Sequence, residues 1–158
     1  MPILGSHQSI SGGLHLAVQR AAEAGCDCVQ IFSKNSNQWR AKKITDKDVK
    51  AWHDAVEEYG ITHPLIHDSY LINLATPDDD LWEKSIAAFT EEMQRAELLG
   101  IPYVVMHPGS YTSADEAFGI ARISEAFNCI HKELGKVSVR ALLETTAGQG
   151  TNLGCTFE

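Results

Sequence analysis

Short apolar runs alternate with longer amphipathic stretches five times along this 158-residue chain. The apolar runs, each interpreted as a strand, lie at residues 3–5, 28–32, 64–67, 103–107 and 137–144. The amphipathic stretches, each interpreted as a helix with its caps, lie at residues 14–24, 45–60, 78–99 and 113–135. Strands that alternate with helices pair in parallel through crossover connections. The pattern therefore predicts an α/β fold, although it does not by itself separate a closed barrel from an open sheet.

Helix-capping residues mark the predicted ends of these helices. Gly25 and Gly100 follow two of them, where a C-terminal cap glycine is expected. Thr45 opens the second helix as an N-cap, and Gly60 closes it. The run Ser-Ala-Asp-Glu at residues 113–116 has the spacing of a capping box and is predicted to open the last helix.

A polar side chain lies at or just past the predicted carboxyl end of each apolar run. These residues are His7, Ser33, His67, His107 and Glu144. Because the carboxyl ends of parallel strands share one rim, these side chains are expected to lie close together. Imidazole and carboxylate groups are common metal ligands. The sequence therefore predicts a metal site made by His67, His107 and Glu144, with His7 as a further possible rim residue.

The other histidines are predicted to lie away from this rim. His63 precedes His67 by four residues, which is about 13 Å along an extended strand and places it at the opposite rim. His15, His53 and His131 fall within predicted helices, where a solvated surface position is the default.

The composition limits which partners and which cellular location can be expected. The formal charge of −8, from 13 basic and 21 acidic residues, argues against a nucleic-acid partner. Bound divalent cations would offset that charge, and Lys34, Arg40, Lys42 and Lys43 form a basic cluster within ten residues. No run of about 18 apolar residues is present, so no membrane span is expected. The N-terminus has no signal-peptide pattern, and four scattered cysteines make no disulfide framework, so a cytoplasmic protein is expected.

Four local sequences resemble a known family. Residues 67–75, His-Asp-Ser-Tyr-Leu-Ile-Asn-Leu-Ala, are similar to the signature of the endonuclease IV family. Phe-Ser-Lys-Asn at 32–35 leading to Gln-Trp-Arg at 38–40, His-Pro-Gly-Ser at 107–110 and Glu-Thr-Thr-Ala-Gly-Gln-Gly at 144–150 strengthen the match. The resemblance extends over the whole chain, which is identified as a member of that family.

The resemblance implies a TIM (β/α)8 barrel with three zinc ions, which hydrolyses the DNA phosphodiester 5′ to an abasic site. The products would be a 3′-hydroxyl and a 5′-deoxyribose phosphate. By position, His67 and His107 would ligate the first zinc, and Glu144 would bridge the first and second and act in catalysis. This chain would then hold one nearly complete zinc site and one shared ligand. Zinc, manganese and iron share these ligand types, so the metal stays open.

The length bears on how much of a barrel is present. Five units in 158 residues average about 32 residues each, so eight would need about 250. Residues 1–158 are therefore expected to form a single domain with the first five strands and four helices of the barrel. Alone, the chain is expected to be inactive, because the family's remaining zinc ligands come from later strands. It is also expected to be poorly soluble, because its two edge strands would be unpaired.

The resemblance also implies a protein that acts as a monomer, has no membrane partner and binds double-stranded DNA with abasic sites. The family inserts a loop after the second strand into DNA, and a tyrosine after the third strand helps to hold the distorted backbone. Those positions here are Asn35, Asn37, Gln38, Trp39 and Arg40 in the loop, with Tyr70 and Asn73 after the third strand. Asn37 departs from the arginine that related enzymes often carry. Packing of Trp39 against the barrel, and of Tyr70 over its mouth, are the alternative interpretations.

Two other functions fit part of the pattern. A sugar isomerase or epimerase on the same barrel also gathers histidines and carboxylates around a divalent metal, but it needs no DNA-inserting loop. A non-catalytic barrel that binds DNA or metal without cutting is favoured by Asn37 and by the acidic net charge. Protection of the metal-loaded protein from unfolding by abasic duplex DNA, rather than by a ketose, would separate the first alternative from a nuclease.

Overall fold

The structure is a computed structural model that describes residues 2–156, with five strands and four helices in strict alternation. The elements are β1 (Gly5–His7), α1 (Leu14–Glu23), β2 (Cys28–Phe32), α2 (Asp46–Tyr59), β3 (Leu65–His67), α3 (Asp79–Leu99), β4 (Tyr103–Met106), α4 (Glu116–Leu134) and β5 (Arg140–Leu143). This order confirms the predicted α/β alternation. The fifth strand is shorter than the predicted residues 137–144. The first strand lies two residues later than the predicted residues 3–5, so His7 is its last residue.

The strands form one parallel sheet in the order in which they occur along the chain. β1 pairs with β2, β2 with β3, β3 with β4 and β4 with β5. In the register of the central strands, His67 lies opposite Phe32 on one side and Val105 on the other. A doubly wound sheet reverses its strand order at a switch point, whereas the wall of a barrel does not. The sequential order among the described strands therefore matches the wall of a barrel.

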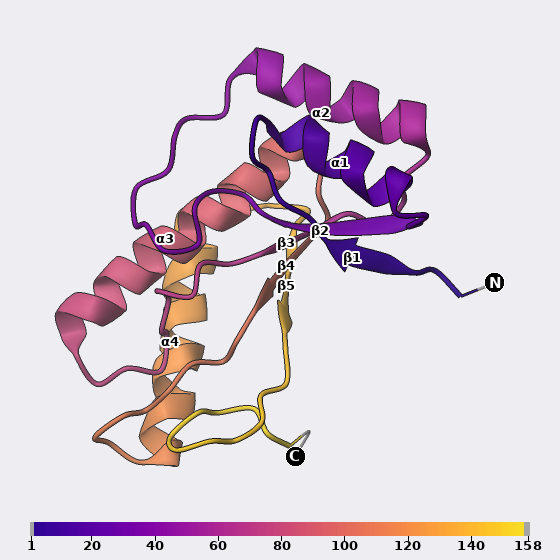
Figure 1. The fold of residues 1–158 in the computed structure, drawn as a ribbon. Helices are drawn as coiled ribbons and strands as arrows, with labels where there is room; N and C mark the ends of the chain where they lie inside the picture. The colour runs from indigo at the N-terminus through magenta and orange to yellow at the C-terminus, as the bar shows by residue number, and fades with distance from the viewer. Residues whose placement is uncertain (1, 157–158) are drawn as a thin grey trace.

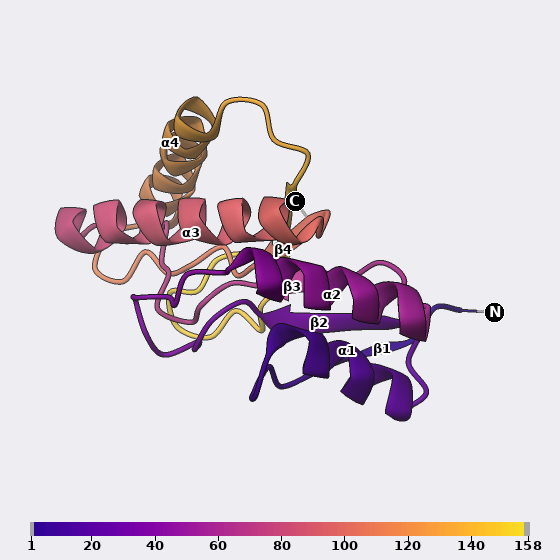
Figure 2. The same cartoon turned by 90° about the horizontal axis from the view of Figure 1, so that it is seen from above.

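The helices cover one side of the sheet (Figures 1 and 2). α1 contacts α2, α2 contacts α3 and α3 contacts α4, so each helix packs beside the next along an arc. The core lies between this layer and the sheet. Its largest fully buried apolar side chains include Trp52, Phe89, Ile31, Ile66, Leu74, Met93, Leu99, Ile101, Met106 and Ile130. Apolar burial at one face explains why these amphipathic segments form helices against this sheet.

Caps fix where the helices begin and end. Thr45 and Asp48 form a capping box at α2, and Gly60 ends that helix in the left-handed region with φ of 65°. The capping box predicted at residues 113–116 is wrong. α4 begins at Glu116, and the side chain of Asp115 accepts the hydrogen bond from the backbone of Phe118. Ser113 lies two residues too early, because the first turn of the helix starts only after Asp115.

The two outer strands are the least covered part of the sheet. Within residues 2–156, β1 and β5 each pair with a single neighbour. Leu143 of β5 is 60% exposed, whereas β4 has three buried residues in a row. A membrane crossing is not available to the described helices, which are too short or too polar.

Candidate metal centre

Three potential metal ligands come together at the carboxyl ends of three neighbouring strands. His67 is the last residue of β3, while His107 and Glu144 directly follow β4 and β5. One ligand atom of each residue lies within 4.8 Å of the other two. Parallel pairing aligns the strand ends, so residues up to 77 positions apart reach one place. The structure thus brings together the three residues singled out from the sequence, and their binding of a metal stays a prediction.

His67 is held so that its outer nitrogen faces Glu144. Its Nδ1 lies 2.9 Å from the carbonyl oxygen of Asp68, and its Nε2 lies 2.9 Å from Oε2 of Glu144. A neutral imidazole has one N–H, and here Nδ1 carries it, because the carbonyl oxygen of Asp68 can only accept a hydrogen bond. The lone pair of Nε2 then faces Oε2 of Glu144. Since both of these atoms are acceptors, a proton or a cation is needed between them. A backbone carbonyl at the far nitrogen is a common way to orient a metal-binding histidine.

His107 completes the group. Its Nε2 lies 3.9 Å from Oε2 of Glu144, and its Nδ1 is buried with no hydrogen-bond partner among residues 2–156. Ligand atoms around a tetrahedral zinc lie about 3.3 Å apart, given bond lengths of roughly 2.0–2.2 Å. The separations of 2.9 and 3.9 Å from Oε2 of Glu144 lie on either side of that value, and all three ligand atoms lie within 4.8 Å of one another. The side chains of His107 and Glu144 are 42% and 46% exposed, so small rotations can close the group. The donor types and spacing therefore fit a divalent cation.

Acidic and aromatic neighbours surround His67. Burial, followed by the negative charges of Glu92 and Glu144, raises the pKa of Asp68 to about 9. A neutral Asp68 carboxyl is therefore favoured next to the group, and a cation beside it would favour the ionised form. The ring of Phe32 lies 5.7 Å from that of His67 and 5.2 Å from that of Tyr70, measured between centroids. Phe32 was not singled out from the sequence, because an apolar strand residue gives no sign of which rings it will touch.

His7 lies at the same rim but outside the three-residue group. Its ring contacts that of Phe32 with centroids 4.4 Å apart and planes tilted by 50°, and its Nδ1 lies 3.0 Å from the side-chain amide of Gln30. Burial, followed by the charge of His67, lowers its pKa. The remaining histidines lie where they were predicted: His63 precedes β3 at the opposite end, and His15, His53 and His131 lie within helices.

A pocket of about 460 Å³ opens beside the three ligands. It is lined by Asp68, Ser69, Tyr70, Ile72, Asn73, His107, Gly109, Ser110, Thr145, Thr146, Ala147, Gln149 and Asn152. Tyr70 is 64% exposed at its edge, consistent with a residue available to a ligand rather than buried over the mouth. These loops all follow the carboxyl ends of strands, so the pocket and the three ligands share one rim.

Asn73 connects two of the loops around this pocket. Its Nδ2 donates to the carbonyl of Ser110, and its Oδ1 accepts from the backbone N–H groups of Ser110 and Ala75. Gly109 adopts φ of 102°, and a Cβ there would lie 2.4 Å from Oδ1 of Asn73, so glycine is required for this approach. Its contacts give Asn73 a structural role, and its contact with DNA stays a prediction.

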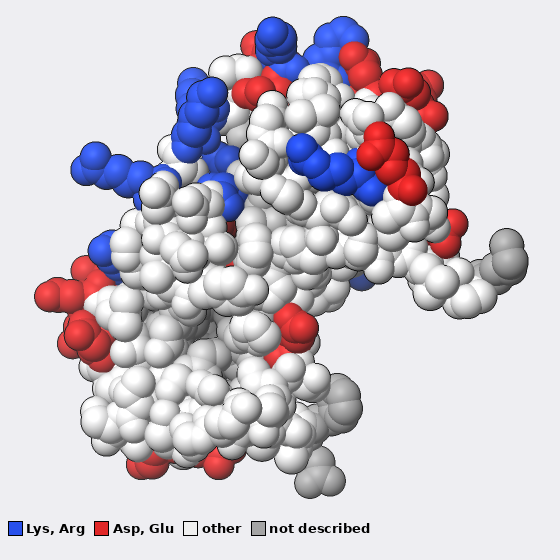
Figure 3. Space-filling view, in the orientation of Figure 1, with Lys and Arg blue, Asp and Glu red and all other residues white. Residues whose placement is uncertain are grey.

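The loop between β2 and α2 presents several predicted DNA contacts to solvent. Asn35, Asn37, Gln38 and Arg40 are exposed or partly exposed. Trp39 is partly buried against the core, and the ammonium of Lys84 lies 4.3 Å from its ring centroid. Its side chain packs partly against the protein, as in the alternative interpretation of the sequence, and its contact with DNA stays a prediction. On the face drawn in Figure 3, Lys and Arg side chains gather over the half that holds this loop and α2.

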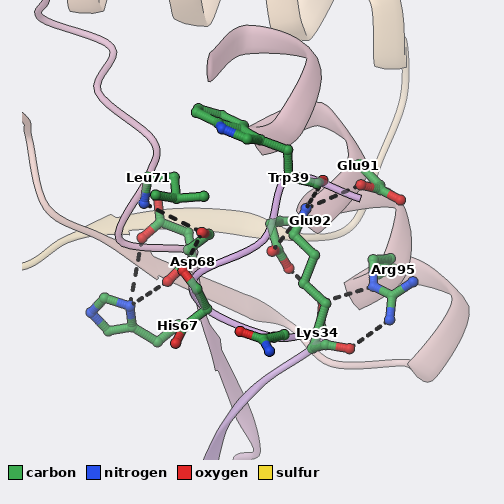
Figure 4. Close-up of polar contacts among 12 residues, drawn as sticks. Lys34, Trp39, His67, Asp68, Leu71, Glu91, Glu92 and Arg95 are labelled. Carbon is green, nitrogen blue, oxygen red and sulfur yellow. Dashed lines mark hydrogen bonds and ion pairs between the residues drawn. The ribbon is translucent and has the colours of Figure 1, made fainter. Parts of the chain in front are cut away.

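Lys34 does not belong to the exposed basic cluster in which the sequence placed it. Its side chain is 3% exposed, and its ammonium lies 3.1 Å from Glu91 and 3.6 Å from Glu92 on α3. Arg95, also on α3, is buried and donates to the hydroxyl of Ser33. Figure 4 shows Arg95 together with Lys34, Glu91 and Glu92. Sequence reasoning missed Glu92 and Arg95, because a charged residue on a helix is usually interpreted as part of a solvated face.

Comparisons with known proteins agree with this geometry. A protein of Geobacter sp. (strain M21) named "Probable endonuclease 4" is 49% identical over 158 residues, which is 100% of this chain and 56% of the relative. The crystal structure of endonuclease IV from Thermus thermophilus superposes with a TM-score of 0.87 at 36% identity, covering 99% of this chain and 56% of that one. A D-tagatose 3-epimerase-like protein has a TM-score of 0.72 at 16% identity, with 97% and 57% covered, which shows a common fold.

The chain thus spans 56% of the length of the Geobacter relative. The resemblance to endonuclease IV proteins stated from the motifs is confirmed by these similarities. The family described as xylose isomerase-like TIM barrel matches residues 18–158. The sequential parallel strands agree with that match. This chain therefore belongs to the xylose isomerase-like TIM barrel family.

Proposed function

We propose that this chain is part of a metal-dependent endonuclease that hydrolyses the DNA phosphodiester 5′ to abasic sites, leaving a 3′-hydroxyl and a 5′-deoxyribose phosphate. One observation carries the proposal: His67, His107 and Glu144 meet within 4.8 Å at the rim of a barrel wall. The names of the Geobacter and Thermus relatives support the choice of DNA as substrate.

In this proposal, His67, His107 and Glu144 hold zinc. A divalent cation there supplies positive charge beside the phosphodiester and lowers the pKa of a water, so that hydrolysis proceeds near neutral pH. The chain's own residues orient the site. The Asp68 carbonyl sets the ring of His67, and the carboxylate of Glu144 lies between the two imidazoles. By family resemblance, Glu144 would also help to hold a second zinc, and the enzyme would hold three.

Recognition of DNA is assigned to the loop residues Asn35, Asn37, Gln38 and Arg40 and to Tyr70. Arg40 adds to a local positive surface in a chain whose overall formal charge is −8. Contacts to the phosphate backbone need such local charge, because the net charge alone would repel DNA. The exposure of Tyr70 at the pocket edge near His67 supports its contact with a nucleotide that enters the pocket.

The test is a nicking assay on a duplex with one abasic site, performed with the zinc-loaded full-length gene product. Cleavage 5′ to the site, with a 3′-hydroxyl on the upstream strand, is expected, and chelation by EDTA should abolish it. The same duplex without the lesion is the control. Zinc binding without nicking would contradict the proposal and favour a non-catalytic barrel. The 158-residue chain alone is expected to nick at background level, because the proposed set of three zinc ions needs ligands beyond His67, His107 and Glu144.

A sugar epimerase on the same barrel is the weaker candidate. The epimerase-like structure is 16% identical to this chain, whereas the Thermus endonuclease IV is 36% identical over a similar span. Protection of the zinc-loaded protein from unfolding by a ketose, but not by abasic duplex DNA, would favour the epimerase.

A further inference from the structure

A buried ionic cluster, made of Lys34, Glu92 and Arg95, contacts the loop between β2 and α2. Arg95 of α3 reaches both ends of the loop: its Nη2 donates to the carbonyl oxygen of Ser33, and its Nη1 donates to that of Lys42 at 2.9 Å. Its Nε also donates to the hydroxyl of Ser33 at 2.7 Å. The planar guanidinium has donors in a fixed fork, which lets one side chain bind two separate backbone segments. One residue therefore fixes the distance between the two ends of the loop.

Lys34 holds the middle of the loop from the same side. Its ammonium donates to the carbonyl oxygen of Trp39 at 3.3 Å and to Glu91 at 3.1 Å, and it pairs with Glu92 at 3.6 Å (Figure 4). Glu92, 1% exposed, also accepts from the hydroxyl of Ser33. From the neighbouring loop, the hydroxyl of Ser69 donates to the carbonyl of Ser36 at 2.6 Å. The loop backbone is thus bonded near its start, its middle and its end.

Directional bonds of this kind fix a conformation more than they add stability. Burying ionised groups is costly, and well-packed apolar residues often stabilise a core as much or more. Here the donors of Lys34 and Arg95 point at loop carbonyls that no helix or strand pairs. On the outer side of the same loop, Asn35, Gln38 and Arg40 are at least partly exposed. The cluster therefore sets the backbone of the segment that carries the proposed DNA contacts.

We propose that Lys34, Glu92 and Arg95 form a clamp that holds residues 35–40 in the conformation that meets abasic DNA. They act as positioning residues, because their polar atoms bind the loop and not the substrate. The inference rests on the proposed function, since it assigns the clamp to the recognition of DNA by that same site. A preformed loop binds with a smaller loss of conformational entropy, so the clamp lowers KM and leaves the chemical step to the metal ligands.

The main test variant is Arg95→Lys. It keeps the positive charge, but one ammonium cannot reach both Ser33 and Lys42 as the guanidinium does. Arg122→Lys is the matched control, since Arg122 donates to Thr76 and Asp79 and makes no bond to the loop. Lys34→Met is a second test variant, which removes the bond to Trp39. Each is made in the zinc-loaded full-length gene product.

Two readouts are compared. The loop contains Arg40, Lys42 and Lys43, so trypsin reports its order directly, while Lys132 and Lys136 near the end of α4 serve as internal reference sites. In both test variants, cleavage after Arg40, Lys42 and Lys43 should be about tenfold faster, because a loosened loop opens more often, with unchanged cleavage at the reference sites. On the abasic duplex, KM should rise about tenfold with kcat within about twofold and with unchanged zinc content. Arg122→Lys should match the wild type in both.

Three results would overturn the inference. Loop cleavage that stays at the wild-type rate would show that the cluster does not hold the loop, whatever the nicking assay gives. A loosened loop with unchanged KM would show that the clamp does not act on DNA. A fall in kcat with unchanged KM would show that the substitution acts on the metal centre and not on the loop. Failure of the wild-type protein to nick abasic DNA would contradict the proposed function itself, and the trypsin result would still report whether the cluster holds the loop.

Discussion

Nε2 of His67 lies 2.9 Å from Oε2 of Glu144, although 77 residues separate them in the sequence. The two side chains meet because β3, β4 and β5 are consecutive parallel strands whose carboxyl ends share one rim. The other nitrogen of the same imidazole, Nδ1, is hydrogen-bonded to the carbonyl oxygen of Asp68. Two acceptors that face each other across 2.9 Å favour a positive charge between them, and the predictions for zinc follow from that relationship.

Replacement Glu144→Gln should weaken zinc binding. The amide keeps the size of the side chain but removes the negative charge that faces both imidazoles. We expect zinc affinity, measured by competition with a fluorescent chelator, to fall by about tenfold or more. Glu125→Gln makes the same chemical change at an exposed position on α4 and should leave zinc affinity unchanged. Equal zinc affinity in the two variants would remove Glu144 from the ligand set.

Zinc should stabilise the fold. A cation that binds the folded state alone adds about 2.7 kcal/mol to the free energy of unfolding when its free concentration is about a hundred times the Kd. Urea unfolding of the full-length gene product with and without zinc measures this increase. Magnesium at the same concentration should add less, because it prefers oxygen ligands to imidazole. Stabilisation of Glu144→Gln by zinc to the same extent as the wild type would count against the site.

The buried carboxyl of Glu92 should make stability depend on pH. Burial raises its pKa above the ordinary value of 4.5 in the folded protein. The folded state then binds the proton more tightly than the unfolded state, so this group's contribution is most favourable below pH 4.5 and declines as pH rises through the folded pKa. The free energy of unfolding of the wild type, relative to Glu92→Gln, should therefore fall as pH rises from 4.5 and then level off. A relative stability that rises over that range would show that the pKa is lowered instead.

The outer strand β5 should promote self-association of the 158-residue chain. Leu143 is 60% exposed on a strand that pairs with one neighbour within residues 2–156. Unpaired strand edges and exposed apolar side chains favour association between chains. Leu143→Lys should lower the apparent mass in sedimentation velocity, whereas Leu98→Lys, at a leucine 56% exposed on α3, should change it little. An equal effect of both substitutions would assign the association to general surface hydrophobicity and not to the strand edge.

The sequence was sufficient to predict the elements and the three potential metal ligands, and both results have a physical reason. An apolar run that ends at His67 or His107 indicates a buried strand and also marks the residue at its carboxyl end. Parallel pairing then brings the carboxyl ends of neighbouring strands together at one rim. The sequence pattern could not separate a barrel wall from a doubly wound sheet. That distinction depends on which strands pair, and the local pattern is the same in both.

The ionic cluster under the loop could not be predicted. Lys34 has the sequence context of an exposed basic run, because its partners Glu91 and Glu92 lie 57 or more positions away on a helix whose orientation the sequence does not define. The prediction of Ser113 as a cap was wrong, because two candidate caps, Ser113 and Asp115, stand two residues apart and local spacing alone favours the first. The prediction that Asn73 contacts DNA came from the family motif, whereas its contacts with Ser110 depend on how two distant loops pack.

The most direct test of the metal centre is anomalous diffraction from crystals grown with zinc, with data collected on both sides of the zinc absorption edge. We expect a peak roughly 2.0–2.2 Å from Nε2 of His67, Nε2 of His107 and a carboxylate oxygen of Glu144. A zinc peak bound elsewhere, with these three side chains left uncoordinated, would show that they do not form a metal site.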